Sequence, residues 1–224
     1  MKQTKRQKTW TNLDMDKVYS VADAIEALRP YTSKKFDESL EIAIRLGIDV
    51  TKADQNIRGM LSLPNGTGKT VRVAVFTANA QDEAKAAGAD VVGGEDLIEK
   101  VAAGEINFDR VIATPDMMPK MSKIARVLGP KGLMPNPKLG TVTNNVADAV
   151  KNAKAGQIEY RAEKKGIIHA GIGKMSFTTA QLVENANALI EQLKKIKPAS
   201  AKGQYILGCA VATTQGPGLK VDVK

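Results

Sequence analysis

The chain has 224 residues, enough for one large domain or two modest ones. Hydrophobic residues make up 43% and charged residues 25%, which argues against a disordered, collagen-like or membrane-spanning chain. Lysine and arginine total 33 against 24 acidic residues, a net charge of +9 that favours a polyanionic partner. The single cysteine, Cys209, excludes an intrachain disulfide, and the lack of an apolar leader or span predicts a cytoplasmic protein.

The first part of the chain contains a helix and two strands. Apolar residues at helical spacing predict a helix over 20–29, which Pro30 ends. Residues 36–46 alternate between apolar and polar side chains, as in a half-buried strand, and a second strand is expected over 57–63.

The middle of the chain alternates strands with helices. We expect strands over 71–76, 89–92 and 108–113, and helices over 80–87, 95–103 and 118–128. The first of these strands is almost continuously apolar, as in a strand that is buried on both faces. This alternation predicts a parallel sheet covered by helices on both faces, which is a three-layer α/β domain.

The C-terminal part returns to strands and one long helix. Strands are expected over 158–161, 166–169, 205–213 and 219–223. The first two flank a turn at 163–166 and predict a hairpin with Gly166 at positive φ. Thr178 and Gln181 form a capping box, which marks the start of the clearest helix in the chain.

The two ends of the chain share a pattern that the middle lacks. We therefore expect a discontinuous antiparallel α+β outer domain of residues 1–66 and 157–224, into which an α/β domain of residues 67–156 is inserted. The two connecting segments contain glycine, and Gly66, Gly68 and Gly156 predict a hinge because glycine absorbs changes in φ and ψ at low steric cost.

No constellation of residues supports catalysis. Residues 66–70 look like the end of a phosphate-binding loop, but Leu63 replaces the first glycine of that motif and a strand follows instead of a helix. The only histidine, His169, has no cysteine or second histidine to join it, and the sequence shows no metal-ligand set or catalytic triad. The sequence thus predicts a protein that is not an enzyme and that needs no cofactor or metal. An α/β nucleotide-binding enzyme is the alternative.

Basic residues beside the expected strands are better candidates for binding. Lys34 and Lys35 precede one strand, and Lys164 and Lys165 occupy the hairpin tip, so one folded sheet would gather them into a cationic rim. RNA recognition through shape and backbone suits such a rim, and solvated surface lysines are the alternative. The loop 128–141 is long, rich in proline and free of acidic residues, and we expect it to project as an ordered binding loop.

Five blocks of sequence carry a resemblance to a known family. They are KFDES at 35–39, DQNIRG at 54–59, LGPKGLMP at 128–135, IEYR at 158–161 and HAGIG at 169–173. In these blocks the chain resembles the family of ribosomal protein L-one, the first protein of the large ribosomal subunit. The resemblance implies a Rossmann-like fold for the inserted domain and an outer domain that grips ribosomal RNA.

The resemblance also implies a function. It implies a structural constituent of the large ribosomal subunit, monomeric within the cytoplasmic ribosome and without membrane contact. Such a protein binds 23S-type rRNA to form the mobile stalk that assists release of deacylated tRNA from the exit site. The resemblance further implies a translational repressor that binds its own operon mRNA.

Motif matching carries the family's RNA contacts onto eight residues. They are Lys35, Phe36, Ser39, Glu163, Lys164, Thr214, Gln215 and Gly216. Gln215 stands where the family usually has methionine. Phe36 shares the parity of the apolar strand face, so burial in the core is the alternative for this residue. The resemblance also suggests that Lys131 and Lys138, in the loop 128–141, face tRNA at the exit site.

Overall fold

The computed structural model describes residues 4, 7–33 and 35–223, which form two compact units. Unit 1 comprises residues 1–68 and 158–224, and unit 2 comprises residues 69–157. The structure thus assigns residues 67 and 68 to the first unit and residue 157 to the second, whereas the sequence places these three residues the other way round.

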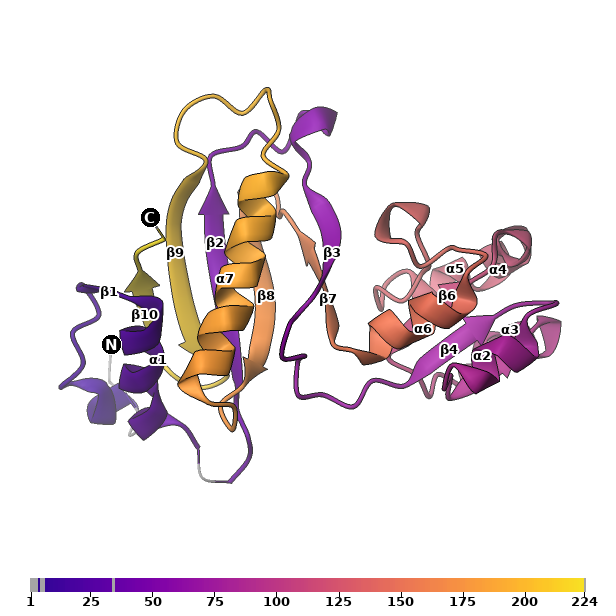
Figure 1. Cartoon of the computed structure of the whole chain (residues 1–224), viewed down its shortest axis with the longest axis horizontal. Helices are drawn as coiled ribbons and strands as arrows, with labels where there is room; N and C mark the ends of the chain where they lie inside the picture. Colours follow the sequence, from indigo (N-terminus) through magenta and orange to yellow (C-terminus); the bar gives the residue numbers. More distant parts are fainter. Residues whose placement is uncertain (1–3, 5–6, 34, 224) are drawn as a thin grey trace. The chain divides into compact units, whose positions relative to one another are not determined.

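Unit 1 is built on a sheet of five strands in the order β1-β10-β9-β2-β8 (Figure 1). The strands are β1 (Val18–Tyr19), β2 (Ser39–Leu46), β8 (Ile167–Lys174), β9 (Ile206–Thr213) and β10 (Gly218–Val221). β2 pairs antiparallel with β8 on one side and with β9 on the other, so it is the central strand. β10 continues the sheet antiparallel to β9, and β1 adds a short parallel edge.

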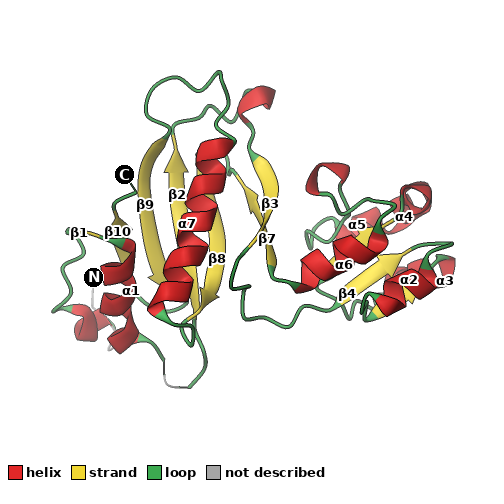
Figure 2. Ribbon diagram, in the orientation of Figure 1, coloured by secondary structure: helices red, strands yellow, loops and turns green. Residues whose placement is uncertain are grey.

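One face of this sheet is covered by two helices, α1 (Val21–Leu28) and α7 (Thr179–Lys195) (Figure 2). The apolar residues of β2 at positions 40, 42, 44 and 46 are buried against them, because alternate side chains of a strand point to one face. α7 begins with the expected capping box, in which the side chains of Thr178 and Gln181 each accept a backbone N–H of the other residue. Its buried stripe includes Leu182, Leu189 and Leu193.

Two expectations for unit 1 are wrong in detail. β2 begins at Ser39 instead of residue 36, so the preceding residues form a loop. The expected hairpin partners also differ, since β7 (Gln157–Arg161) pairs with β3 (Arg58–Ser62) in a separate two-stranded sheet. The chain after β7 meets β8 at an isolated bridge between Ala162 and Ile168 and at a bond from the Glu163 N–H to the Ile167 carbonyl (2.9 Å), and Gly166 has the expected positive φ of 72°.

Unit 2 contains a parallel sheet of three strands in the order β5-β4-β6. The strands are β4 (Val73–Phe76), β5 (Val91–Gly93) and β6 (Arg110–Ala113). Side chains of the helices α2 (Gln81–Ala86) and α6 (Val146–Lys154) form an apolar cluster with Val73 and Val75. The helix α3 (Glu95–Ala102) and the segment 117–128 form a second cluster with Ala74 and Phe76. Alternate residues of β4 therefore pack into two apolar cores, one on each face of the sheet.

The sequence-based description of unit 2 needs two corrections. The expected helix over 118–128 is broken into α4 (Met118–Met121), a 3-10 turn (Ser122–Ile124) and α5 (Ala125–Leu128). The break coincides with a bond from the Ser122 hydroxyl to the Pro119 carbonyl (2.6 Å), a local bond that competes with regular helix. The sequence analysis also missed α6, although Asn145 caps it and its buried residues recur at helical spacing.

Candidate nucleic-acid interface

The face of the five-stranded sheet that α1 and α7 leave uncovered is lined mainly by small residues. One cross-strand row runs from Lys220 through Ala210 and Ala43 to His169, across four strands. The next rows add Gly218, Ala212, Glu41 and Gly171, and then Gly208, Arg45 and Ile167. All these residues are exposed or half-buried, and their strand neighbours are buried except Leu207, next to Gly208, which is 48% exposed. This open face is therefore a shallow shelf that a nucleic-acid backbone can approach closely.

Three basic side chains stand on the open face. Lys220 and His169 lie at the two ends of the alanine row, three strand spacings or about 14 Å apart. Arg45 is exposed on the central strand, two residues beyond Ala43. The ammonium of Lys220, which also pairs with Asp16 (3.2 Å), and the guanidinium of Arg45 suit the phosphates of an RNA strand or helix better than they suit an enclosed small molecule.

A buried carboxylate organises the loop at the Ser39 end of β2. Glu38 is 1% exposed and accepts the backbone N–H groups of Ser33 (2.7 Å) and Gln215 (3.4 Å). It thereby connects the loop before β2 to the turn after β9, two segments that are far apart in sequence. Buried charged acceptors are retained when such hydrogen bonds satisfy them.

Asp37 fixes the same loop from its other side. Its carboxylate accepts the backbone N–H of Ser176 (3.1 Å) and the Ser176 hydroxyl (2.7 Å). Lys35 and Phe36 precede this pair of anchors and are exposed, Phe36 by 44%. The core alternative for Phe36 is therefore wrong, and the loop displays a cation and an aromatic ring to solvent. Lys34, the neighbouring member of the expected rim, lies outside the described residues.

The turn after β9 is held to the start of β2 by Thr214. The Thr214 hydroxyl accepts the Ser39 N–H (2.9 Å) and lies 3.3 Å from the Ser39 carbonyl oxygen, and the Thr214 N–H also donates to that carbonyl (3.1 Å). Two of the expected contact residues therefore brace each other. Gly216 has no room for a side chain, because a Cβ there would collide with the Thr213 hydroxyl, which is buried without a partner in the described chain.

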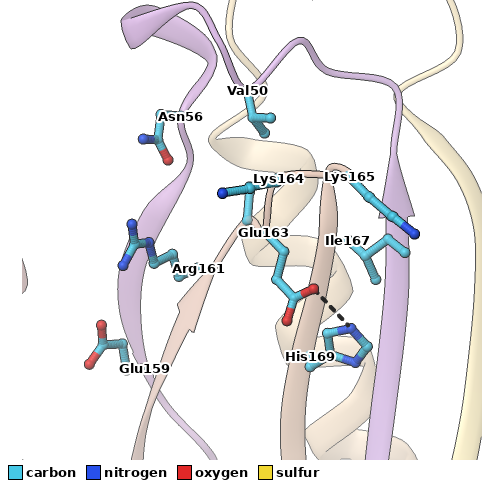
Figure 3. Close-up of a pocket in the computed structure, with 10 residues that line it drawn as sticks. Val50, Asn56, Glu159, Arg161, Glu163, Lys164, Lys165, Ile167 and His169 are labelled. Carbon is cyan, nitrogen blue, oxygen red and sulfur yellow. Dashed lines mark ion pairs between the residues drawn. The ribbon is translucent and has the colours of Figure 1, made fainter. Parts of the chain in front are cut away.

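The opposite end of the sheet carries a hollow of about 1020 Å³ (Figure 3). It is lined by Val50, Asn56, Glu159, Arg161, Ala162, Glu163, Lys164, Lys165, Ile167 and His169. The turn from Glu163 to Gly166, closed by a hydrogen bond from the Gly166 N–H to the Glu163 carbonyl (2.8 Å), brings the two lysines to its rim.

Cations are in excess around this hollow. Glu159 is paired with Arg58 (2.8 Å), and Glu163 lies 3.8 Å from the His169 ring (Figure 3). Among the described residues, the structure gives no carboxylate partner to Arg161, Lys164 or Lys165. Unpaired cations around a wide, solvent-open hollow are suited to phosphate groups.

The chain matches the Ribosomal protein L1p/L10e family over residues 28–217 of 224. It belongs to this family. The match confirms the resemblance seen in the five sequence blocks. Proteins of the family are structural, RNA-binding components of the large ribosomal subunit and are not enzymes.

The eight expected contacts of this L1p/L10e-family protein do not form one rim. Lys35, Phe36, Ser39 and residues 214–216 gather at the Ser39 end of β2, whereas Glu163 and Lys164 lie beyond Leu46 at its other end. The eight residues of β2 separate the two groups by about 23 Å, at about 3.3 Å per residue. The open face lies between the two groups. This open face was not predicted from the sequence, although small residues recur at the alternate, solvent-facing positions of β2, β8 and β9.

The segment before unit 2 is anchored to α7 by a buried amide. The Asn185 side chain is fully buried, accepts the Asn65 N–H (3.1 Å), and donates to the carbonyls of Gly66 (3.0 Å) and Ile172 (2.7 Å). Gly68 also packs on unit 1, since a Cβ there would approach Lys174 and Phe177. Gly66 and Gly68 both have positive φ, which suits glycine. The carbonyl of Gly66, however, is held by its hydrogen bond from Asn185.

The basic loop of unit 2 is partly folded into its core. Pro135 and Leu139 are buried, and Leu133 and Met134 pack against the apolar cluster below the sheet. The Asn136 side chain accepts the Lys138 N–H (2.9 Å) and fixes the turn. Lys131 and Lys138 are exposed. The loop is thus an ordered surface with two displayed lysines, and the expectation that it projects as a whole is wrong.

The part of the chain that the structure describes holds no group of three or more metal-binding side chains. It also has no helix that is long and apolar enough to cross a membrane.

Removal of the Glu38 carboxylate should loosen both loops at the Ser39 end. Glu38→Ala leaves two backbone N–H groups without their charged acceptor, which costs about 2–3 kcal/mol in the free energy of unfolding. Hydrogen exchange should quicken at residues 33–39 and 214–216. Glu41→Ala is the control, because Glu41 is exposed on β2, which follows this loop. Equal effects of the two variants would show that Glu38 is not the anchor.

Removal of the Asn185 amide should release the segment before unit 2. In Asn185→Ala, the Asn65 N–H and the Gly66 carbonyl lose their partners, and exchange at the Asn65 amide should quicken at least tenfold. Asn187→Ala, on the exposed side of α7, is the control. Unchanged exchange at Asn65 in the Asn185 variant would contradict the anchor.

Proposed function

We propose that unit 1 binds 23S-type rRNA along its open face, with contacts at both ends of β2. The observation that carries the proposal is the KFDES segment, in which Asp37 and the buried Glu38 anchor the loop through hydrogen bonds while Lys35 and Phe36 are displayed. Family membership supports an rRNA partner within the large subunit. An ordered cation beside an exposed ring suits an RNA backbone and an adjacent unstacked base.

Individual roles follow from the contacts of each residue. Lys35 and Lys164 are exposed and supply phosphate contacts, and Phe36 supplies a stacking face. Ser39 and Thr214 hold each other, so they act by fixing the loop, and the Thr214 oxygen keeps further acceptor capacity for an RNA hydroxyl. Gly216 permits close approach of the backbone, and Gln215 offers an amide in place of the family's usual thioether.

Glu163 fits the same surface through His169. The carboxylate lies 3.8 Å from the ring, at the edge of the hollow, and it can accept a ribose 2′-hydroxyl. A carboxylate within a cationic site also disfavours misplaced phosphates, which sharpens the register of the RNA.

The nucleotide-binding alternative has less support. Residues 66–70 lead into β4 and not into a helix, and Gly66 and Gly68 pack on unit 1 instead of cradling a ligand at a helix start. Titration with ATP and NAD beside an rRNA fragment distinguishes the two functions. Tight nucleotide binding without RNA affinity would favour the alternative.

The wider role that we propose rests on the same surface. Bound to rRNA as a monomer, the protein forms the mobile stalk that assists release of deacylated tRNA from the exit site, with Lys131 and Lys138 facing that tRNA. A segment of its own operon mRNA that mimics the rRNA site would occupy the open face and repress translation. Competition between that mRNA and the rRNA fragment for one site tests the repressor role, and simultaneous binding of both would refute it.

Removal of one displayed cation should weaken rRNA binding in a salt-dependent way. For Lys164→Ala, the slope of log K against log salt should fall by about one unit, as expected for one lost phosphate contact. Lys85→Ala in unit 2 is the control with the same change of charge. Filter binding over a range of salt gives both slopes, and an unchanged slope for Lys164→Ala would reject its phosphate role.

Unit 2 should move relative to unit 1 if Gly66, Gly68 and Gly156 form a hinge. Energy transfer between dyes at Asn79→Cys and Asn187→Cys measures this motion, and burial raises the pKa of Cys209 to about 12, which protects it from labelling. At least two distance populations are expected, with a shift on exit-site tRNA binding. One narrow distance under all conditions would defeat the hinge. Prolines are unsuitable at these glycines, whose φ values of 66°, 69° and 88° they cannot adopt.

A further inference from the structure

A group of lysines on unit 1 lies outside the surface described so far. Lys194 and Lys195 end α7, and Lys197 and Lys202 follow in the loop that leads to β9. All four are exposed, and the sequence has no acidic residue between 192 and 221. The C-terminal end of a helix favours cations and accounts for Lys194 and Lys195, but it does not account for Lys202.

The loop that carries Lys202 is held in one conformation. The Lys197 ammonium donates to the Gly203 carbonyl (3.4 Å) and lies 5.9 Å from the centre of the Tyr205 ring, so Lys197 is used to close the loop. The side chain of Gln55, which is 5% exposed, donates to the Ser200 carbonyl (3.4 Å), and Ala201 is buried. Lys194, Lys195 and Lys202, here termed the helix-end lysines, are thus displayed from an ordered base.

The helix-end lysines and the turn at Lys164 and Lys165 flank the same bend of the chain. The Leu46 N–H donates to the Gly166 carbonyl (2.9 Å), and the Gly47 N–H donates to the Tyr205 carbonyl (2.7 Å). The bend after β2 is therefore bonded both to Gly166, which follows Lys165, and to Tyr205, which lies three residues after Lys202. At this end of the sheet, segments 46–56, 163–166 and 191–204 carry seven lysines against four carboxylates.

We propose that the helix-end lysines bind the phosphate backbone of an RNA segment that continues past the open face and around this bend. The proposal rests on the proposed rRNA function, because the RNA backbone bound at Lys164 and Lys165 would continue to the helix-end lysines. Lysine is a point charge suited to phosphates, and the structure gives the helix-end lysines no carboxylate partner among the described residues. No large hydrophobic side chain is exposed between 190 and 205, so the anchor of a protein interface is missing in that described stretch.

Two RNAs of different length test the proposal on the full chain. One is the rRNA fragment that covers the open face alone, and the other is the same fragment extended by about one helical turn at both ends. The triple variant Lys194→Gln, Lys195→Gln and Lys202→Gln should bind the short RNA normally. It should bind the long RNA about tenfold more weakly at 0.15 M salt, with a salt slope lower by about one to three units. The matched control is Lys85→Gln, Lys100→Gln and Lys151→Gln in unit 2, three exposed lysines.

Three other results would overturn the proposal. Unchanged affinity and slope of the triple variant for the long RNA, with short-RNA binding intact, would overturn the proposal alone. If the wild-type chain binds neither RNA, the proposed function fails and this inference fails with it. If the variant keeps both RNAs but loses affinity for polyglutamate, the helix-end lysines serve an acidic protein segment instead, which also overturns the proposal. Thermal unfolding of the variant at the wild-type temperature shows that its fold is intact.

Discussion

The antiparallel pairing of β2 with two neighbours is the constraint on which unit 1 depends. Because β2 is central, its even-numbered residues from Leu40 to Leu46 must be buried under α1 and α7, while Glu41, Ala43 and Arg45 face outward. The small residues of β8 and β9 then make the uncovered side a shelf. Each end of β2 leads into a loop that returns from a distant part of the chain. The binding surface that we propose is therefore the uncovered face of this sheet together with the loops at its ends.

Residues of this surface have one of two roles. Asp37, Glu38 and Thr214 use their polar atoms within the protein, and in doing so they hold Lys35 and Phe36 outward. The acidic residues at 37 and 38 are thus explained by the loop that they shape. The same division recurs at the other end, where Lys197 closes a loop that displays Lys202. Preorganised loops lose less conformational freedom when RNA binds.

The sequence predicted long, regular features better than short or non-local ones. The capping box and apolar stripe of α7 and the alternation along β2 are local signals, and the structure has both elements. The pairing of β7 with β3 is not local, and a strand's pattern does not reveal which neighbour it will find. Phe36 is a second example. Its position in the alternating pattern was that of a core residue, but it lies before the start of β2 and is exposed. The anchors of Gly66 also depend on Asn185, a polar residue on the buried face of a distant helix.

The chemical reactivity of individual lysines with and without rRNA tests the central claim most directly. With a stalk rRNA fragment bound, acetylation measured by mass spectrometry should slow at Lys35, Lys164, Lys165 and Lys220, which lie on the open face and at its two ends. Lys85, Lys100 and Lys151 of unit 2 should react at their original rates. Protection confined to unit 2, or unchanged rates at Lys35 and Lys164 in a saturated complex, would contradict the claim that the open face of unit 1 is the RNA-binding surface.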